Sequence, residues 1–154
     1  MNRILLAICG AAAALGGGCF LEEFRAPPVG APLDACQGLD SNPLLPVSFS
    51  LEIMPILMRD EKMAGCSCHQ PGSANTKGLE ETELDPSSHG SLMRGGTKTR
   101  TDIVIPFDPC RSMLYLKLVS PPFGGRMPDS GPPYLSAAEA QLFHDWIAEG
   151  AFAN

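Results

Sequence analysis

The sequence lacks the features that mark several common classes of protein. Basic residues are few, with 11 Lys and Arg against 17 Asp and Glu, and the formal net charge is −6, so a nucleic-acid partner is not expected. There is no nucleophile elbow, phosphate-binding loop or paired-carboxylate pattern, and we therefore do not expect an enzyme. No internal repeat is visible.

Two further absences concern the fold. Apart from the ambiguous stretch Ile103–Ile105, no strand-like alternation persists for more than a few residues, so we predict a mainly α protein. The longest apolar run, from Ile4 to Leu15, is too short for a stable membrane-spanning helix. A length of 154 residues leaves room for one small domain.

The N-terminus has the pattern of a secretory leader. Arg3 is followed by the apolar run and then by Gly16-Gly17-Gly18-Cys19, which gives a positive region, an apolar region and a small-residue exit. The stretch before Cys19 resembles the bacterial lipoprotein signal. We predict a signal peptide over residues 1–18 and a lipidated Cys19 as the first mature residue, with ordinary signal-peptidase cleavage as the alternative. The expected location is periplasmic or in the cell envelope, anchored to a bacterial membrane.

Residues 19–47 are rich in proline and glycine and lack helical periodicity, so we predict a tether there and a folded domain over 48–154. The domain opens with a short apolar segment capable of helix, in which Ser50 is a candidate cap and Pro55 is expected near the start. Residues 70–101 are predicted to form a long loop with one short helix.

Two more helices are expected towards the C-terminus. Asp108-Pro109 is a candidate cap and first position, and Pro121-Pro122 would end that helix. Ser136 and Glu139 form a capping-box pattern at the start of the last helix, and Gly150 fits its end.

The residues with the clearest chemical meaning are Cys66-Ser67-Cys68-His69 and, much later, Met127 in Met127-Pro128. Cysteine thiols can add across the vinyl groups of haem, and a histidine directly after the second cysteine can ligate the iron. The usual spacing has two residues between the cysteines. Here there is one, and Gly65 stands where the first cysteine would fall.

The stretches that carry a family resemblance extend from Ser48 to Ala151. They are Ile53-Met54-Pro55-Ile56-Leu57, Cys68-His69-Gln70-Pro71-Gly72, Gly78-Leu79, Ile105-Pro106-Phe107-Asp108-Pro109, Ser112-Met113-Leu114-Tyr115-Leu116-Lys117-Leu118, Arg126-Met127-Pro128, Leu135-Ser136-Ala137-Ala138-Glu139 and Trp146-Ile147-Ala148-Glu149-Gly150-Ala151. Together they are similar to the cytochrome c family, in particular to small bacterial haem-c domains of secreted proteins and lipoproteins.

The resemblance implies a cytochrome c-like helical domain with long loops and one covalent haem c. Cys66 and Cys68 would attach the haem, His69 would be the proximal ligand of the iron and Met127 the distal one. A His/Met pair leaves no open position on the iron, so the implied function is electron transfer to a redox partner protein.

The short spacing leaves three outcomes open. Haem could be attached through Cys68 alone with Cys66 released for a disulfide, or through both cysteines after local rearrangement, or it could have been lost. If both cysteines hold haem, Cys36 pairs with Cys110; without haem, the four cysteines of the folded part allow three pairings. The alternative function is a haem-free, disulfide-stabilised lipoprotein domain that binds partners or serves as structure. A copper or zinc site of Cys66, Cys68, His69 and Met127 is a weaker alternative.

Four other side chains are candidates for a place at the site or in the core. His144 is expected at the surface or its boundary without a ligand role, and His89 in a solvated loop, as a substitute ligand should Met127 not serve. Trp146 is expected in the core. Arg126 is a candidate partner for a haem propionate, although an arginine beside glycines is more often simply solvated.

Overall fold

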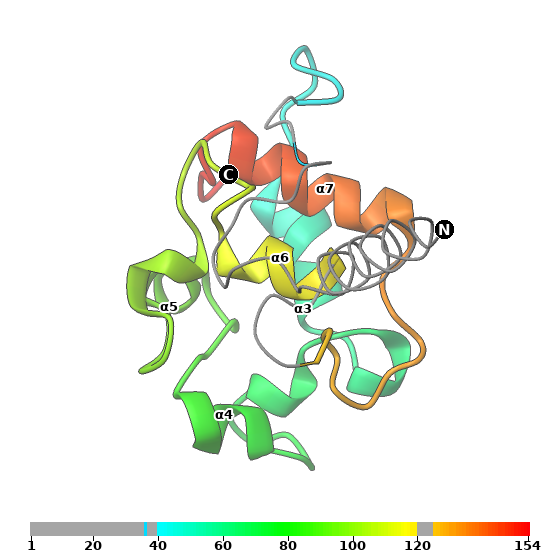
Figure 1. Ribbon diagram of the computed structural model, residues 1–154, viewed down its shortest axis with the longest axis vertical. Coiled ribbons are helices and arrows are strands. Elements are labelled where there is room, and N and C mark those ends of the chain that lie inside the picture. Colours follow the sequence, from blue (N-terminus) through cyan, green and yellow to red (C-terminus); the bar gives the residue numbers. More distant parts are fainter. Residues whose placement is uncertain (1–35, 37–39, 120–124) are drawn as a thin grey trace, which may run out of the picture. The chain divides into compact units, whose positions relative to one another are not determined.

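The computed structural model describes Cys36, residues 40–119 and residues 125–154. These residues form short helices joined by long loops (Figure 1), and the prediction of a mainly α fold is confirmed because no β-strand occurs among them. The helical elements are η1 (Phe49–Ile53), α3 (Met54–Leu57), η2 (Glu61–Met63), η3 (Ser67–His69), α4 (Lys77–Thr82), α5 (His89–Arg94), η4 (Arg100–Ile103), α6 (Met113–Val119) and α7 (Ala137–Ala148). The predicted signal peptide, Cys19 and most of the predicted tether lie outside the described residues.

Helix α7 begins and ends where the sequence predicts. The Ser136 hydroxyl accepts from the Glu139 N–H at 3.2 Å, and the Glu139 carboxylate accepts from the Ser136 N–H at 3.0 Å, which completes the capping box. Gly150 follows the helix with a φ of 112°, a backbone conformation that glycine adopts without strain.

The segment before the cysteine motif is helical, as predicted, but a different serine caps it. The Ser48 hydroxyl accepts from the Leu51 N–H at 3.2 Å, so the prediction that Ser50 is the cap was wrong. The chain turns into the helix earlier because the Phe49 side chain is buried in the core. Pro55 lies in the first turn of α3, as predicted, where its missing N–H costs little.

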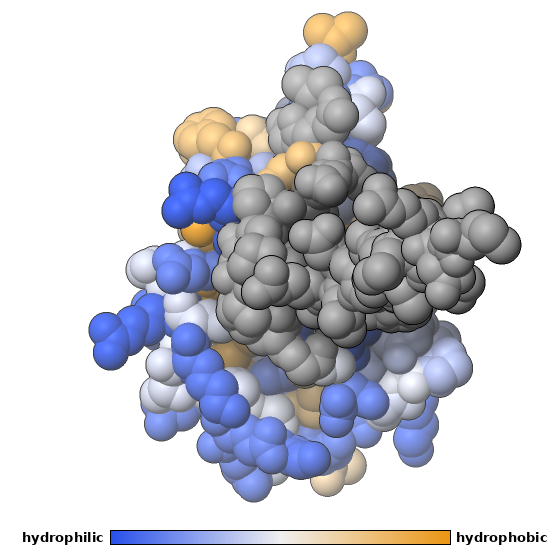
Figure 2. Space-filling model, viewed as in Figure 1, coloured by the Kyte–Doolittle hydropathy of each residue, from blue (hydrophilic) through white to orange (hydrophobic). Residues whose placement is uncertain are grey.

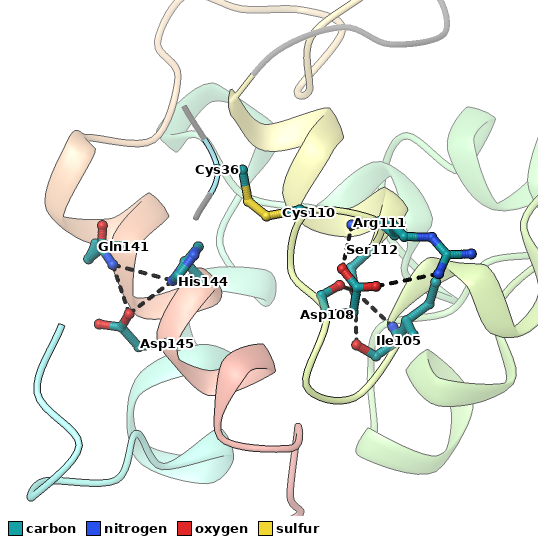
Figure 3. Close-up of a disulfide and its surroundings, with 9 residues drawn as sticks. All are labelled: Cys36, Ile105, Asp108, Cys110, Arg111, Ser112, Gln141, His144 and Asp145. Carbon is teal, nitrogen blue, oxygen red and sulfur yellow. Dashed lines mark hydrogen bonds and ion pairs between the residues drawn. A yellow bond between two sulfur atoms is a disulfide. The ribbon is translucent and has the colours of Figure 1, made fainter. Parts of the chain in front are cut away.

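Asp108-Pro109 closes a turn and does not open a helix, so the predicted start of this helix was wrong. The Ser112 hydroxyl, which is fully buried, accepts from the Ile105 N–H at 2.8 Å and donates to the Asp108 carbonyl at 2.8 Å (Figure 3). These bonds hold the backbone as a turn, and α6 begins only after it, at Met113. Pro121-Pro122, the predicted end, lies outside the described residues.

The core lies where α7 packs against η1 and α6. Its most deeply buried side chains are apolar: Ile53, Leu57, Leu92, Val104, Phe143, Trp146 and Ile147. Burying such a side chain fully contributes about 1.5–3 kcal/mol each. Trp146 is 1% exposed, which confirms its predicted place in the core.

The predicted loop 70–101 contains more helix than expected. It holds both α4 and α5, and η4 begins at its end. Helix α5 starts with a reciprocal cap between Ser88 and Ser91 and buries Leu92 in the core. Helix α4 buries none of its residues fully and instead packs against η3, the turn that contains the cysteine motif.

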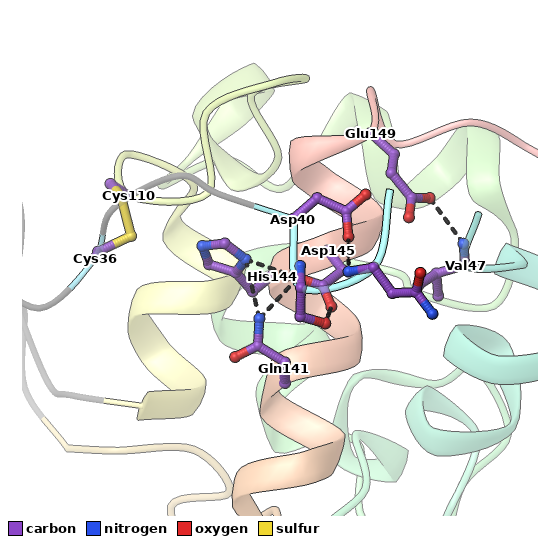
Figure 4. A network of polar contacts seen from close by, with 10 residues as sticks. Cys36, Asp40, Val47, Cys110, Gln141, His144, Asp145 and Glu149 are labelled. Carbon is purple, nitrogen blue, oxygen red and sulfur yellow. Dashed lines mark hydrogen bonds and ion pairs between the residues drawn. A yellow bond between two sulfur atoms is a disulfide. The ribbon is translucent and has the colours of Figure 1, made fainter. Parts of the chain in front are cut away.

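The last residues of the predicted tether are fastened to α7 (Figure 4). Asp145 accepts from the Ser41 N–H at 3.1 Å and also from the Ser41 hydroxyl, while the Val47 N–H donates to Glu149 at 2.8 Å. Gln141 donates to the same Asp145 carboxylate at 2.7 Å. Residues 40–47 are therefore part of the folded unit, ahead of the predicted boundary at residue 48.

Apolar side chains that remain exposed come from separate segments. They are Leu44, Leu45, Leu51, Met58, Met63, Phe107, Tyr134 and Phe152. On the face shown in Figure 2, hydrophilic side chains cover most of the coloured surface and the apolar ones form small separate patches.

Candidate functional site

The cysteine motif forms a tight turn shortly after η2. The Cys66 carbonyl accepts from the His69 N–H at 2.9 Å, which closes the 3₁₀ turn η3. The Cys66 N–H donates to the Leu57 carbonyl at 3.0 Å and so ties the motif to the end of α3. A 3₁₀ turn rises only about 2 Å per residue, so Cys66 and Cys68 lie closer together than they would in extended chain.

Gly65 lies where the backbone leaves no room for a side chain. A Cβ at this position would overlap the backbone carbonyl and the Cβ of Arg59. Arg59 is itself held in place, because its guanidinium donates to and forms an ion pair with Glu139 at the start of α7. The position that would hold the first cysteine of the usual spacing is therefore filled by the Arg59 backbone.

His69 packs against α4. A Cβ on Gly78 would lie 2.7 Å from His69 Nε2, so the glycine allows the outer edge of the ring to approach the helix. His69 Nδ1 lies 3.3 Å from the Thr82 hydroxyl. Burial lowers the pKa of His69 and outweighs a backbone hydrogen bond with Leu84 and the charge of Glu81, both of which raise it. The imidazole is thus kept neutral near pH 7, the form that ligates a metal.

The cysteines separate into one disulfide and two thiols. Cys36 and Cys110, 74 residues apart, are bonded (Figure 3), whereas Cys66 and Cys68 are free and half-buried. Burial, followed by the neighbouring Cys68, raises the pKa of Cys66 to about 12, and burial followed by Glu61 raises that of Cys68. Among the described residues, neither motif cysteine has the disulfide partner that one of the predicted outcomes required for Cys66.

Met127 lies on a loop that is fastened to α6 by hydrogen bonds. The Met127 N–H donates to the Lys117 carbonyl at 2.9 Å. The two residues before it are also held, since Lys117 Nζ donates to the Gly125 carbonyl at 3.0 Å and Arg126 Nε to the Leu118 carbonyl at 2.6 Å. Three consecutive residues of this loop are thus tied to one helix, which fixes the place of Met127.

Cys66, Cys68, His69 and Met127 line one cavity of about 520 Å³. Its other walls are mainly apolar and include Leu57, Leu84, Leu92, Ile103, Leu114 and Leu118. Small-molecule and cofactor sites typically occupy about 300–1,000 Å³ and have such walls. A smaller cavity of about 340 Å³ also has Cys68, His69 and Met127 in its lining. The structure therefore brings the four predicted site residues together.

The other two histidines lie elsewhere, in surroundings that differ from those predicted. His144 is only 5% exposed, with Nδ1 3.1 Å from Asp145 Oδ1, so it is not a surface residue. His89 Nε2 lies 2.7 Å from the Ala151 carbonyl, and its ring centroid is 5.1 Å from that of Phe49. Neither histidine lines the cavities described above, which removes His89 as a substitute ligand.

Arg126 does not line these cavities either, although it precedes Met127. Its guanidinium donates to the Leu118 and Leu135 carbonyls and lies 4.5 Å from the centre of the Tyr134 ring. The cationic side chains in the lining of the larger cavity are Lys98 and Lys117. No motif relates these lysines in the sequence, because one precedes η4 and the other lies within α6.

No preformed metal site occurs among the described residues. In the part of the chain that the structure describes, no group of three or more His, Cys, Asp or Glu residues is placed to hold a metal ion. The copper or zinc site considered from the sequence thus gains no support.

The part of the chain that the structure describes contains no helix with the length and apolarity needed to traverse a bilayer.

Comparison with protein-family models, curated proteins and solved structures finds no match to this chain. The functional interpretation therefore depends on the geometry of the cavity and on the chemistry of its side chains.

Proposed function

We propose that the larger cavity holds a single c-type haem, with His69 and Met127 as axial ligands, and that the protein transfers electrons in the cell envelope. The observation that carries the proposal is the convergence of two distant parts of the chain on one apolar cavity: the turn at Cys66–His69 supplies two free thiols and an imidazole, and Met127 supplies a thioether. An imidazole and a thioether are the axial ligands of low-spin cytochromes c.

The residues present fit such a cofactor in three respects. The cavity is large enough for a small-molecule cofactor, and its apolar walls would exclude water from a porphyrin face. Burial lowers the pKa of His69, which favours the neutral imidazole, the form that ligates a metal. The disulfide engages Cys36 and Cys110, so the thiols of Cys66 and Cys68 remain available for addition to vinyl groups.

We propose electron transfer and not catalysis, because two protein ligands would fill both axial positions of the haem iron. A haem in this site would supply a one-electron couple, and a thioether ligand favours the reduced iron relative to a second nitrogen ligand. The chain's own contributions are ligation, burial and the exclusion of solvent. A redox partner protein and a membrane anchor through Cys19 complete the proposal.

The test is optical and uses matched methionines. The mature chain, produced in a host that attaches haem c, is expected to show a Soret band that persists after acid–acetone extraction. Met127→Ala should abolish the charge-transfer band of a methionine-ligated ferric haem, whereas Met63→Ala should leave it unchanged because Met63 is 60% exposed and is not among the residues that line the cavity. A chain that carries no covalent haem under these conditions contradicts the proposal.

The second candidate is a haem-free domain of the same fold that acts as a binding or structural lipoprotein. The observation in its favour is the short Cys66-x-Cys68 spacing, fixed by the packing of Gly65 on Arg59. Intact mass and thiol counting of the natively isolated chain distinguish the two, since this candidate requires a mass without the haem increment and unmodified thiols at Cys66 and Cys68.

A further inference from the structure

Exposed apolar side chains gather near the C-terminal end of helix α7. Among the described residues eight large apolar side chains are exposed, and five of them lie within residues 147–154 or on segments that are hydrogen-bonded to those residues. These five are 60–87% exposed, and we call them the apolar end: Leu44, Leu45, Leu51, Phe107 and Phe152. Single exposed apolar side chains are normal, whereas a group of them marks a surface for interaction.

The two phenylalanines of the apolar end are held in place by backbone and ring contacts. The Phe107 N–H donates to the Ile147 carbonyl at 2.8 Å, and the ring centroids of Phe107 and Phe152 lie 6.3 Å apart. The φ of Phe107 is 67°, a conformation that costs free energy in a bulky residue. Because 67% of Phe107 remains exposed, burial in the core does not explain this conformation. An outward-facing ring held at such a cost points to a contact outside the domain.

The first two leucines of the apolar end lie in a turn that is fixed on both sides. Residues 43–46 read Pro-Leu-Leu-Pro, and the two leucines are 87% and 68% exposed. The Leu45 N–H donates to the Asn42 carbonyl at 3.0 Å, and hydrogen bonds to Asp145 and Glu149 hold the chain before and after the turn. This segment, cyan in Figure 1, projects beyond α7. The leucines are therefore presented outwards by a backbone that is already ordered.

The chain that leads to the predicted lipid anchor joins the domain near this end. Cys36 is bonded to Cys110, which follows Phe107 by three positions, or about 11 Å of extended backbone at most. The predicted lipidated Cys19 lies 17 positions before Cys36, a span of at most about 60 Å. A lipid on Cys19 would therefore draw the domain towards the bilayer from the side on which the apolar end lies.

The apolar end has the chemistry of a contact with a lipid surface. None of its five side chains lines either of the two cavities described above, so they are not walls of a ligand-binding cavity. Leucine and phenylalanine side chains enter the boundary between lipid headgroups and acyl chains through burial of their apolar area. Residues 40–52, 105–108 and 147–154 contain no Lys or Arg, so the favoured lipid surface is zwitterionic and not anionic.

We propose that the apolar end inserts into the zwitterionic surface of the membrane to which the chain is anchored, with Leu44 and Leu45 leading. This inference rests on the membrane anchor in the proposed function and is independent of the haem. Membrane anchoring commonly combines a lipid with a second contact of the polypeptide, and this contact would also fix the orientation of the domain. The residues that line the proposed haem cavity are not part of the contact, which leaves them for the redox partner.

The first measurement asks whether the polypeptide itself binds lipid. The full mature chain with Cys19→Ser, which removes the lipidation site, is produced without the leader and with its disulfide intact. It is mixed with phosphatidylcholine vesicles, and the bound fraction is measured by sedimentation. We expect binding that added phosphatidylglycerol does not strengthen. Leu44→Ser and Leu45→Ser should each weaken the partitioning roughly threefold, and the double variant roughly tenfold.

Met63→Ser is the matched control. Met63 is 60% exposed, but it belongs to η2 and not to the apolar end, so its replacement should leave the partitioning unchanged. The three substituted side chains lie mostly in solvent, and each variant should melt close to the wild type by circular dichroism, which keeps the comparison free of unfolding.

The second measurement locates the apolar end in the lipid-anchored chain. The fluorescence of Leu44→Trp should be quenched when the vesicles contain brominated phosphatidylcholine, whereas that of Met63→Trp should not. The native Trp146 is 1% exposed and contributes the same background to both variants.

The outcomes separate this inference from the proposed function. Failure of the Cys19→Ser chain to bind vesicles, or binding that survives unchanged in the double variant, overturns the membrane contact. Self-association through Leu44 and Leu45 without lipid also overturns it, because a second copy would then be the occupant. None of these results affects the haem proposal, which is judged by the Soret band. A natural chain whose intact mass shows no lipid on Cys19 overturns the anchor, while vesicle binding that depends on Leu44 and Leu45 would still support the contact.

Discussion

Replacing Gly65 by alanine or cysteine is expected to destabilise the protein, although cysteine there would restore the usual spacing of a haem-attachment motif. A Cβ at this position would overlap backbone and side-chain atoms of Arg59. The chain cannot move aside freely, because the Gly65 N–H donates to the Asp60 carbonyl at 3.0 Å and the next N–H donates to Leu57 at 3.0 Å. Arg59 is restrained in turn by its ion pair with Glu139.

The expected magnitude follows from the cost of overpacking. Forcing extra atoms into a well-packed site typically costs about 1–3 kcal/mol. In a domain of this size each kcal/mol lowers the melting temperature by roughly 3–6 °C. Gly65→Ala and Gly65→Cys should therefore melt about 3–18 °C below the wild-type protein when unfolding is followed by circular dichroism.

A second glycine supplies the control. A Cβ on Gly90, in helix α5, would meet nothing within 4 Å, and alanine is favoured over glycine in helices by up to about 1 kcal/mol. Gly90→Ala should be as stable as the wild type or slightly more stable. If Gly65→Ala melts together with Gly90→Ala and the wild type, then the packing of Arg59 does not determine the short spacing.

Three further predictions concern stability. Cys36→Ser, which opens the bond to Cys110 across 74 residues, should lower the unfolding free energy by about 2–4 kcal/mol in urea titrations; the same loss after mild reduction of the wild type would agree with it, and no loss would contradict it. The bond from Arg59 lowers the pKa of Glu139 to about 2 from an ordinary value of 4.5. The ionised Glu139 therefore stabilises the folded state fully above pH 4.5, and this stabilisation is lost as the pH falls towards 2. Glu139→Gln should flatten the dependence of the unfolding free energy on pH between about 4.5 and 2. An unchanged dependence in this range would show that the pair of Arg59 and Glu139 does not cause it. Asp145→Asn should cost about 1–3 kcal/mol in urea titrations, because the carboxylate accepts several partly buried hydrogen bonds, including two from Ser41; a variant as stable as the wild type would show that this network does not hold residues 40–47.

Helix α7 was predictable because all of its signals are local. The Ser136–Glu139 capping box needs only residues of the first turn, and the glycine after the helix needs only its own backbone angle. The start of α6 was not predictable from the same kind of signal. Asp108-Pro109 is compatible with a helix cap, but the buried Ser112 hydroxyl bonds to Ile105 and Asp108 and holds the segment as a turn. Tertiary burial of one hydroxyl decides between the two conformations.

The surroundings of His89 and His144 also depend on contacts that local sequence patterns do not predict. The position of His89 depends on the Ala151 carbonyl and the Phe49 ring, which lie far from it in sequence. His144 is covered by packing that includes the Tyr115 ring, 5.3 Å away between centroids. Neither contact leaves a periodic or spacing signal, so sequence alone placed both residues too near the solvent. The approach of Met127 to the cysteine motif, in contrast, was anticipated by resemblance to a family and not by any local pattern.

In the shortened motif the backbone around Cys66 is held in place by hydrogen bonds. In the usual spacing the first cysteine precedes the second by three positions, whereas here that place belongs to a glycine packed on the Arg59 backbone. The first cysteine of this motif is instead Cys66. Its backbone N–H donates to the Leu57 carbonyl and its carbonyl accepts from the His69 N–H. Because the same hydrogen bond that closes the turn also positions the His69 backbone, a rearrangement that carried Cys66 towards a second vinyl group would disturb the proposed axial ligand. Attachment through Cys68 alone avoids this conflict, and the result that this geometry favours is a haem-loaded chain in which Cys66 reacts with a thiol reagent once the chain is unfolded, because burial raises the pKa of the Cys66 thiol in the folded state.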